Sequence, residues 1–581
     1  MSNDVTTPDG GAPMPPPTNR RRALWVATGV AGLTGVVGLA ALGGLAARDN
    51  KSDRTDRVAD TQAATAQQKV SGDDGGKKAD ADEQNERDQK GDGKEKGERG
   101  EVQEVPCDED ALIDAIREAN RDGGGTLKLA RDCTYKLHEA IDKTATGLPT
   151  IKEEITIKGE GSTIKRDSED GFRIFRVAEG GDLTLKDLTV TGGNVGENKK
   201  PVKYVPRPMS RPTHDKDSGE DGGGLLVQRG GEATLVQTKF TLNSADDNGG
   251  AIANFGEVEV QNSTLDNNHA GDNGGAIFNA GVLEVEGSND GKGGESRITN
   301  NTAGENGGGI ANGTKRKHHG PRPGGTDLVG GRDGDHDDDH DDGKAGTVEI
   351  EKTLIEGNKA DKNGGGISSN GGFVDVSWTS IDNNTASDNG GGIYAVDTVL
   401  TVERSKLTKN HAGKDGGGIY NVSSEEREHP NAQRHDKDKD KGGTATVTDS
   451  EILENSAGRF GGGIFNGEPV EEHNGHPAPA AQPNHEDHED FEATLTLRNT
   501  KIAKNFAGEN GGGIYNNEGK VTLTNSHVTE NKAQVENNKD TEDIAGGIFN
   551  NDGKVTLDDD STVTRNDPRN CAGDPIEGCD D

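Results

Sequence analysis

Short stretches of this chain alternate apolar and polar residues with a period of two. The clearest are KVTLTNS (520–526), TATVTDS (444–450) and GEVEVQNS (256–263). A second short pattern of this kind occurs in HVTEN and KIAKN, and a third occurs in GGIYN. Such alternation indicates half-buried strands. Three short strands in each unit of about 26 residues predict one coil of a β-solenoid, whose neighbouring coils pair in parallel about 4.8 Å apart.

The unit repeats along the chain, and a buried-looking Ile or Leu marks the same position in each copy. Spacings of 25 to 27 residues occur four times, and the other gaps of 33, 57, 45, 50 and 34 residues indicate insertions into the same unit. With two or three less regular coils between Ile155 and Val190, we expect about 12 coils and a length on the order of 60 Å. The anchor positions are Leu225, Ile252, Ile277, Ile310, Ile367, Ile393, Ile419, Ile464, Ile514 and Ile548.

Three further columns keep the same register. Two of them consist of Asn and predict side-chain ladders inside the solenoid, in which each Asn amide bonds to the Asn above and below, and the third consists of Ala. A column of Asn can also bind a ligand, and this alternative stays open. Nine residues before the anchor stand Asn243, Asn268, Asn301, Asn358, Asn384, Asn410, Asn455 and Asn505. Seven before it stand Ala245, Ala270, Ala303, Ala360, Ala386, Ala412, Ala457 and Ala507. Two after it stand Asn254, Asn279, Asn312, Asn421, Asn466, Asn516 and Asn550.

Runs of two or three Gly precede nearly every anchor, as in ENGGGIYNN (509–517). Gly is favoured where a turn needs positive φ or where backbones approach closely. A phosphate-binding loop would occur once, between a strand and a helix. We therefore interpret these runs as structural turns that enter the anchor strand.

The ends of the repeat region carry features of caps, which a solenoid requires. Asp108 can N-cap a helix with Leu112, Ala115, Ile116 and Ala119 on one face, ended by Gly123–Gly125. The four cysteines fall in two local pairs near these ends, Cys107 with Cys133 and Cys571 with Cys579. Two disulfides in an oxidising compartment are expected, and four free thiols are the alternative.

Composition supports a thin core. The 581 residues carry a net charge of −38 and only 28% apolar residues, too few for several large globular cores. Such a chain is either largely disordered or a solenoid. The acidity argues against a nucleic acid partner, because phosphates are repelled.

The N-terminal region predicts export. Residues 1–22 form a Pro/Gly-rich tail that ends in Arg20–Arg22, and an uncharged apolar run follows over 23–47. This run is long enough for a transmembrane helix with the C-terminal part outside the cytoplasm. The alternatives are a cleaved signal, since Arg21-Arg22 resembles a twin-arginine export signal, and a buried core helix. Residues 48–104 are predicted to be a disordered charged linker.

GGAIFN, GGGIYN and GGGIFN resemble the repeats of chlamydial polymorphic outer-membrane proteins. CDEDALIDAIREAN, followed by GGTLKL, resembles the N-terminal cap of right-handed parallel β-helix proteins of the pectin-lyase-like superfamily. The resemblance covers about residues 105–570 and implies an all-β, right-handed parallel β-helix with an N-terminal cap helix and a short tail, 571–581. It does not select an activity, because that superfamily holds lyases, hydrolases, adhesins and autotransporter passengers. The chain ends in DPIEGCDD without an LPxTG-type sorting tail, so attachment is expected through the N-terminus.

No catalytic residue can be assigned from the sequence. The GHG and RIK segments that β-helix galacturonases share are absent, and DDD at 558–560 stands without them. Carboxylates are so numerous that no pair for glycoside hydrolysis stands out. The prediction leans against catalysis, with a polysaccharide lyase or glycoside hydrolase as the alternative.

Insertions at about 315–345, 425–441 and 468–491 leave the coil four to six residues after the anchor, which predicts that they gather along one edge. A fourth, 196–221, leaves elsewhere and is locally basic. His336 and His340, with Asp335, Asp337 and Asp339, can bind a divalent ion, but their spacing matches no established site. A solvated acidic loop is the favoured interpretation. We therefore expect no cofactor and no structural metal site, with weak binding of Ca²⁺ or another divalent cation left open.

Together these features predict an exported surface protein, membrane-tethered or secreted. It is expected to be a monomeric rod that acts as an adhesin-like or cell-envelope interaction module. The expected partner is a cell-envelope or extracellular polysaccharide or protein, engaged through many weak contacts. A purely structural coat component is a further alternative.

Overall fold

The computed structural model describes residues 102–196, 220–288, 294–314, 344–424, 443–470, 472–473, 476–477, 493–534 and 543–579. All of them belong to one compact unit, Lys94–Asp581. The predicted tail (1–22), the apolar run (23–47) and nearly all of the linker (48–104) lie outside these ranges, as does most of each insertion, including His336 and His340. Within the described ranges, no helix has the length and apolarity that a membrane crossing requires.

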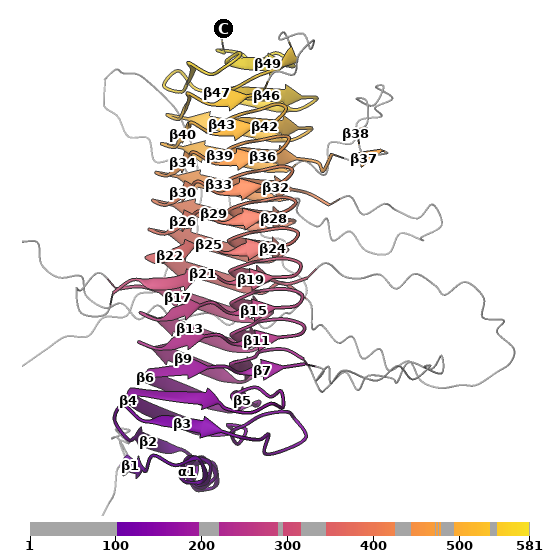
Figure 1. Cartoon of the computed structure of the whole chain (residues 1–581). Coiled ribbons are helices and arrows are strands. Elements are labelled where there is room, and N and C mark those ends of the chain that lie inside the picture. The colour runs from indigo at the N-terminus through magenta and orange to yellow at the C-terminus, as the bar shows by residue number, and fades with distance from the viewer. Residues whose placement is uncertain are drawn as a thin grey trace, which may run out of the picture. The chain divides into compact units, whose positions relative to one another are not determined.

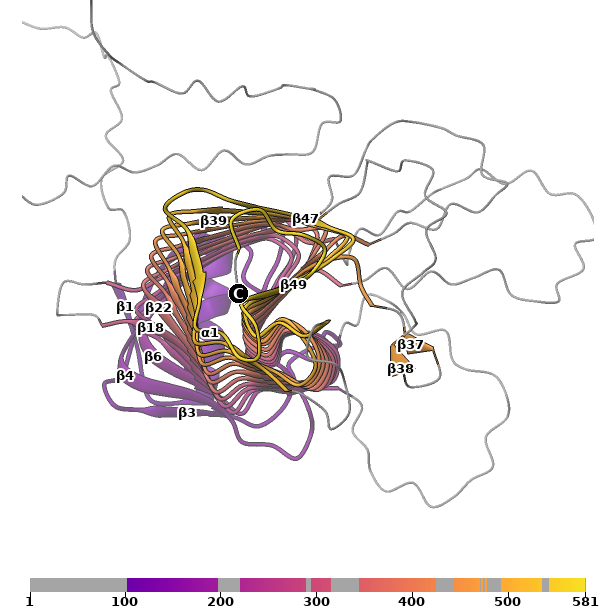
Figure 2. The same cartoon turned by 90° about the horizontal axis from the view of Figure 1, so that it is seen from above.

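The described chain is mostly β, and its coils stack into three parallel sheets (Figure 1). A typical coil contains β13 (Glu257–Gln261), β14 (Thr264–Asp266), β15 (His269–Ala270) and β16 (Ile277–Asn279). β13 and β14 belong to a bent sheet of 25 strands, β15 to a sheet of 10 and β16 to a sheet of 12. The two-residue strand at the Asn–Ala column adds a fourth strand to the three expected in each coil. Figure 2, seen along the stack, shows the coils superimposed on one another.

The sheet of 12 strands holds the anchor positions and agrees with the expected number of coils. Its strands are β5 (Phe175–Val177), β8 (Leu225–Val227), β12 (Ile252–Asn254), β16, β20 (Ile310–Asn312), β24 (Ile367–Asn370), β28 (Ile393–Val396), β32 (Ile419–Val422), β36 (Ile464–Gly467), β42 (Ile514–Asn517), β46 (Ile548–Asn551) and β49 (Cys571–Gly573). The sheet of 10 contains β7 (Asn194–Val195), β11 (Ser244–Ala245), β15, β19 (Thr302–Ala303), β23 (Lys359–Ala360), β27 (Thr385–Ala386), β31 (His411–Ala412), β35 (Ser456–Ala457), β41 (Phe506–Ala507) and β45 (Lys532–Ala533).

The bent sheet supplies two strands from each regular coil. Its strands are β1 (Val102–Val105), β2 (Gly125–Leu129), β3 (Thr134–Leu137), β4 (Glu154–Arg166), β6 (Asp182–Thr191), β9 (Glu232–Val236), β10 (Lys239–Thr241), β13, β14, β17 (Val282–Glu286), β18 (Ser296–Thr299), β21 (Thr347–Glu351), β22 (Thr353–Glu356), β25 (Phe373–Ser377), β26 (Ser380–Asp382), β29 (Val399–Glu403), β30 (Lys406–Thr408), β33 (Thr444–Thr448), β34 (Glu451–Leu453), β39 (Thr494–Arg498), β40 (Lys501–Ala503), β43 (Lys520–Thr524), β44 (His527–Thr529), β47 (Lys554–Leu557) and β48 (Thr562–Thr564). A separate antiparallel pair, β37 (Glu472–His473) and β38 (His476–Pro477), lies in the third insertion.

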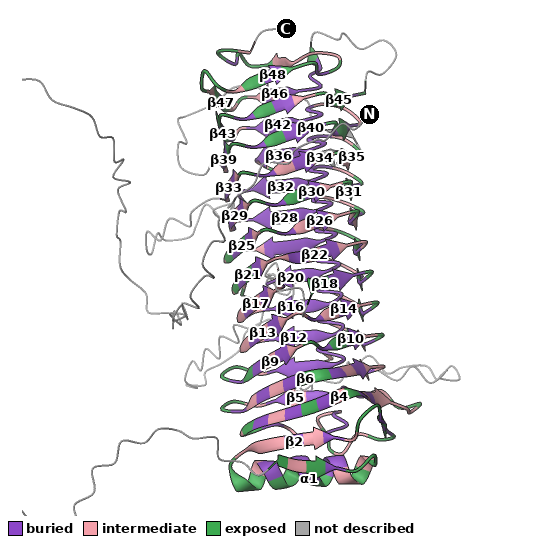
Figure 3. Cartoon of the chain, turned by 90° about the vertical axis from the view of Figure 1, so that its left-hand side faces the viewer, coloured by how far each residue is buried: buried purple, intermediate pink, exposed green. Residues whose placement is uncertain are grey.

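The predicted register of the anchors is confirmed. Each anchor pairs with the next one, from Leu225 to Ile548, across every gap in the spacing. All of them are fully buried in one continuous apolar core. Figure 3 shows buried positions alternating with more exposed ones along the strands, as the period of two predicts. The insertions therefore leave the coil without shifting its pairing.

A corner turn separates the two strands that each coil gives to the bent sheet. A single non-Gly residue with positive φ makes this turn, as at Asn262 (φ 48°), Trp378 (φ 52°), Arg404 (φ 47°), Asp449 (φ 51°) and Asn499 (φ 48°). L-residues adopt this conformation at a cost, so the surrounding coils impose it. The turn directs these side chains away from the core.

Both predicted caps are present. α1 (Glu109–Asp122) begins at Asp108, whose Oδ1 accepts from Ala111 N at 3.1 Å, and ends at Gly123 with φ 82°. Its apolar face packs on the first coil, and Figure 2 shows α1 across that end of the stack. Val102 opens β1 in parallel pairing with β2, so residues 102–104 of the predicted linker are part of the solenoid.

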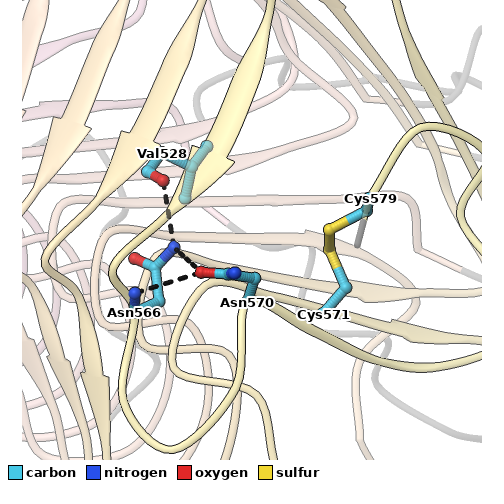
Figure 4. Close-up of a disulfide and its surroundings, with 5 residues drawn as sticks. All are labelled: Val528, Asn566, Asn570, Cys571 and Cys579. Atoms are coloured by element: carbon cyan, nitrogen blue, oxygen red, sulfur yellow. Dashed lines mark hydrogen bonds between the residues drawn. A yellow bond between two sulfur atoms is a disulfide. The ribbon is translucent and has the colours of Figure 1, made fainter. Parts of the chain in front are cut away.

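The predicted disulfides, Cys107–Cys133 and Cys571–Cys579, are both formed. The second lies beside Asn566 and Asn570 at the C-terminal end (Figure 4). Cys571 also pairs with Ile548, so β49 extends the anchor sheet into the predicted tail. Each disulfide therefore fastens a terminal coil, where one side of the stack has no further neighbour.

Candidate binding site at the Trp378 corner

The Asn column nine residues before the anchors is a hydrogen-bonded ladder in the interior. From Asn243 to Asn570, each Nδ2 donates to the Oδ1 of the next Asn at 2.9–3.2 Å. Each Nδ2 also donates to a backbone carbonyl, as Asn268 does to Phe240 at 3.1 Å, and each Oδ1 also accepts a backbone N–H. These buried amides keep no group for a ligand. The column is scaffold, as predicted.

The second Asn column is interrupted in its middle. Asn421 Nδ2 donates to Asn466 Oδ1 at 2.8 Å, but the preceding position is Ala395, which pairs with Asn421 in register. Asn421 Oδ1 is buried and accepts no hydrogen bond from the described residues. A missing amide in the ladder therefore leaves one buried acceptor unsatisfied.

We expect Ala395→Asn to stabilise the solenoid by about 1 kcal/mol, because the new Nδ2 can donate to Asn421 Oδ1. The free energy of unfolding in urea measures the effect. Ala395→Val is the matched control, since it adds bulk without an amide. Equal stabilities of the two variants would contradict the prediction.

A column of carboxylates runs along the outer face of the bent sheet. Glu259, Glu284, Glu349 and Asp375 are direct neighbours in the parallel register. Partial burial, followed by the neighbouring charges of Glu259 and Glu349, raises the pKa of Glu284 to about 7. Parallel in-register pairing stacks like charges in this way, at a cost to folding.

We expect the solenoid to be more stable at pH 5 than at pH 8. The pKa of Glu284 is raised in the folded state, so its contribution is complete at low pH and is lost as the pH rises through about 7. Glu284→Gln should therefore add about 1 kcal/mol at pH 8, after solvent screening, and almost nothing at pH 5. Urea unfolding at both pH values measures this. Glu454→Gln, on an exposed turn, is the control, and a gain that does not depend on pH would refute the assignment.

A hollow of about 480 Å³ opens at the corner of the bent sheet. It lies between β29, β33 and β39 on one side and β30, β34 and β40 on the other. Figure 1 shows the latter three stacked along one edge. We call it the corner hollow. It is lined by Arg404, Ser405, Lys406, Asp449, Ser450, Glu451, Asn499 and Lys501.

The positive-φ residues of successive corner turns form a row of flat side chains beside this hollow. The Arg404 guanidinium lies 5.1 Å from the centre of the Trp378 ring. Asn499 Nδ2 donates to Asp449 Oδ1 at 2.8 Å, and Asn525 Nδ2 donates to Asn499 Oδ1 at 2.8 Å. The Trp378 side chain is 56% exposed. We call these five residues the corner row; it presents an aromatic face and planar hydrogen-bonding groups to solvent.

Most charges that line the hollow are paired with one another. Lys406 Nζ lies 2.8 Å from Glu451 Oε2, and Arg404 Nη2 lies 3.8 Å from Asp449 Oδ2. Arg404 also contacts Glu403. The serines that line the hollow are buried and donate to carbonyls of their own coils. Of the charged residues that line the hollow, Lys501 is therefore the one without an ion-pair partner among the described residues.

Lys501 differs from the other basic residues of the hollow. Among the described residues, neither its ammonium nor the nearby Arg498 guanidinium has an ion-pair partner. Lys501 pairs in register with Glu451 on one side and His527 on the other. The end of the hollow away from Trp378 is therefore basic, on a chain that is strongly acidic as a whole.

The described residues give no catalytic or metal assignment. They contain no group of three or more His, Cys, Asp and Glu side chains placed to hold a metal ion. Asp558, in the DDD segment, accepts from Asn525 N at 3.1 Å and from Ser561 Oγ at 2.6 Å, and these bonds lower its pKa. Asp558 therefore shapes a turn.

The fold and the corner define the class of protein: a parallel β-solenoid with a solvent-facing polar and aromatic corner. Residues 262–280, 352–370 and 379–396 match the Chlamydia polymorphic membrane protein repeat. Each match extends from a corner turn, or the residue after one, through the Asn–Ala strand to the anchor strand. The chain matches no curated protein. The corner hollow lies beyond the matched segments, so the repeat similarity explains the scaffold and not this site.

Proposed function

We propose that this chain is an exported surface protein whose right-handed parallel β-helix, of the pectin-lyase-like type, is a non-catalytic interaction module with an adhesin-like role. The repeat similarity to polymorphic membrane proteins supports a surface location. The two disulfides support an oxidising compartment. The apolar run 23–47 supplies either a single-pass anchor or an export signal.

The observation that supports this proposal most directly is the corner row beside its hollow. Trp378 stands at positive φ with 56% of its surface exposed, so burial in the core does not account for a bulky aromatic residue at this corner. An exposed aromatic ring in one row with amides and carboxylates, with the Lys501 ammonium three coils further along the same corner, is suited to contact with a polymer. The partner is then a cell-envelope or extracellular polysaccharide or protein that lies along the corner, and a repeating polymer can engage many copies of the protein.

The test uses the full-length protein and a panel of acidic and neutral polysaccharides, with and without Ca²⁺. We expect a polymer to co-sediment with the protein and to keep its length. Trp378→Ala should weaken the binding about tenfold. Phe373→Ala, at the other end of β25 and 59% exposed, is the matched control and should leave it unchanged. Shortened polysaccharide chains with new ends would support the lyase or hydrolase alternative. Binding that Trp378→Ala leaves unchanged would place the contact elsewhere on the protein.

A further inference from the structure

The outer face of the bent sheet changes its chemistry at β29. The middle row of this face holds the column of four carboxylates on β13, β17, β21 and β25. On the next five strands, β29, β33, β39, β43 and β47, which Figure 1 shows stacked one above another, the same row holds Thr401, Thr446, Thr496, Thr522 and Thr556. We call the outer surface of these five strands the threonine face. We propose that the threonine face binds the surface of ice.

The threonine face is a two-dimensional grid. Thr444 and Thr494 flank the middle row on one side, and Thr448 and Thr524 flank it on the other. Neighbouring strands lie about 4.8 Å apart, and alternate residues of one strand about 6.6 Å apart. In-register pairing continues over four coil steps, about 19 Å. Both spacings are close to those between water molecules on the faces of hexagonal ice, so many hydroxyls can meet lattice positions at once.

The hydroxyls of the middle row are not used by the scaffold. All five of these Thr residues are at least partly exposed, and none of their Oγ1 atoms bonds to another described residue. Inward hydroxyls bond to backbone carbonyls, as Thr379 Oγ1 donates to Ser377 O at 2.9 Å and Thr500 Oγ1 to Arg498 O at 2.9 Å. The outward hydroxyls therefore keep a donor and acceptors for water. The stacked coils hold them in place beforehand, so little order has to be gained on binding.

The preference of Thr for strands does not account for this face. Thr is common in exposed strands, but the same row accepts Glu and Asp in the four preceding coils. In a chain of net charge −38, the middle row has no charge over five coils. This matters because a charged group gives up bound water at a high cost when it is pressed against a neutral solid. The charged residues of the face stand in its two outer rows and are Glu403, Arg498, Lys520 and Lys554.

The experiment measures the gap between the melting and freezing temperatures of a single ice crystal in a solution of the full-length protein. We expect the wild-type protein to open such a gap and to give the crystal facets. Thr496→Lys places a long charged side chain in the centre of the grid and should reduce the gap about tenfold. Thr446→Lys should do the same from the adjacent coil. Thr234→Lys, in the same row on β9 but outside the threonine face, is the matched control and should change nothing.

Urea unfolding of each variant shows that the solenoid is intact. A wild-type protein that neither facets the crystal nor opens a gap would overturn the inference, as would an equal loss for Thr234→Lys and Thr496→Lys. Binding to crystalline cellulose that Thr496→Lys abolishes, without any effect on ice, would assign the face to a solid polymer instead. This inference goes beyond the proposed function and does not depend on it. Trp378→Ala, which tests the corner row, should leave the gap unchanged, and a loss of the gap in that variant would contradict the placement of ice on the threonine face.

Discussion

Asn410→Ala is expected to lower the free energy of unfolding by about 4 kcal/mol, because it removes four buried hydrogen bonds at once. Asn410 Nδ2 donates to Asn455 Oδ1 at 3.0 Å and to Ile381 O at 2.9 Å. Its Oδ1 accepts from Nδ2 and from the backbone N of Asn384, both at 3.0 Å. Truncation leaves these partners buried in the middle of the stack, where water cannot replace the amide.

Urea unfolding followed by circular dichroism measures this loss. Asn525→Ala is the matched control, because Asn525 makes an amide–amide bond of 2.8 Å to Asn499 on the exposed corner row. Water can replace that bond, so this variant should lose only about 1 kcal/mol, mainly because Ala tolerates the positive φ of Asn525 less well than Asn does. A loss at Asn410 as small as the control would mean that the ladder does not carry the stability of the central coils. Two separate unfolding transitions in place of one would show that the stack divides into two folding units near Asn410.

The scaffold could be predicted from sequence because its residues are constrained from both sides. An inward position such as Ile393 must fit the Ile above and below it, and an Asn such as Asn384 must bond to the Asn of the next coil. Stacking thus repeats the same residue type at the same spacing. A further ladder of Ser and Thr carries the same signal fourteen residues before the anchor and was missed. In it, Thr379 N donates to Ser405 Oγ at 3.0 Å, and Ser405 N donates to Ser450 Oγ at 3.0 Å.

The corner turns and the candidate site could not be predicted in this way. Gln237, Lys352, Trp378 and Arg404 all take positive φ at the same corner, although they share no side-chain preference for it. The hydrogen bonds of the adjoining coils hold the backbone there, so the corner accepts these four residues as well as the Asn and Asp that favour positive φ, as at Asn262 and Asp449. The hollow is also assembled from coils that insertions separate, which hides its residues along the chain. An exposed Trp in a chain with few aromatics was the signal that could have indicated it.

Arg459→Ala is expected to cost about 3 kcal/mol at pH 7, because it leaves a carboxylate buried without its cation. The column four residues before the anchor is an amide ladder through Asn363, but Asp415 occupies the same position two coils further on. Its side chain is only 2% exposed, and Arg459 Nη2 lies 2.5 Å from it. Phe460 N also donates to Asp415 Oδ1 at 3.2 Å. The ion pair with Arg459 therefore stabilises the buried carboxylate at the coil where the amide ladder is interrupted.

A pH series and a second substitution identify this cause. Burial raises the pKa of Asp415, so in Arg459→Ala the carboxyl can take up a proton, and the lost stability should return as the pH falls. Asp415→Asn combined with Arg459→Ala should cost less than Arg459→Ala alone, because the amide restores the type of residue that the ladder uses without a charge. Lys414→Ala breaks the exposed pair with Asp388 (3.1 Å) and should cost under about 0.5 kcal/mol. If the losses in free energy of unfolding for Asp415→Asn and Arg459→Ala simply add in the double variant, the two side chains do not act as a pair, and the ion pair is not the cause of the loss.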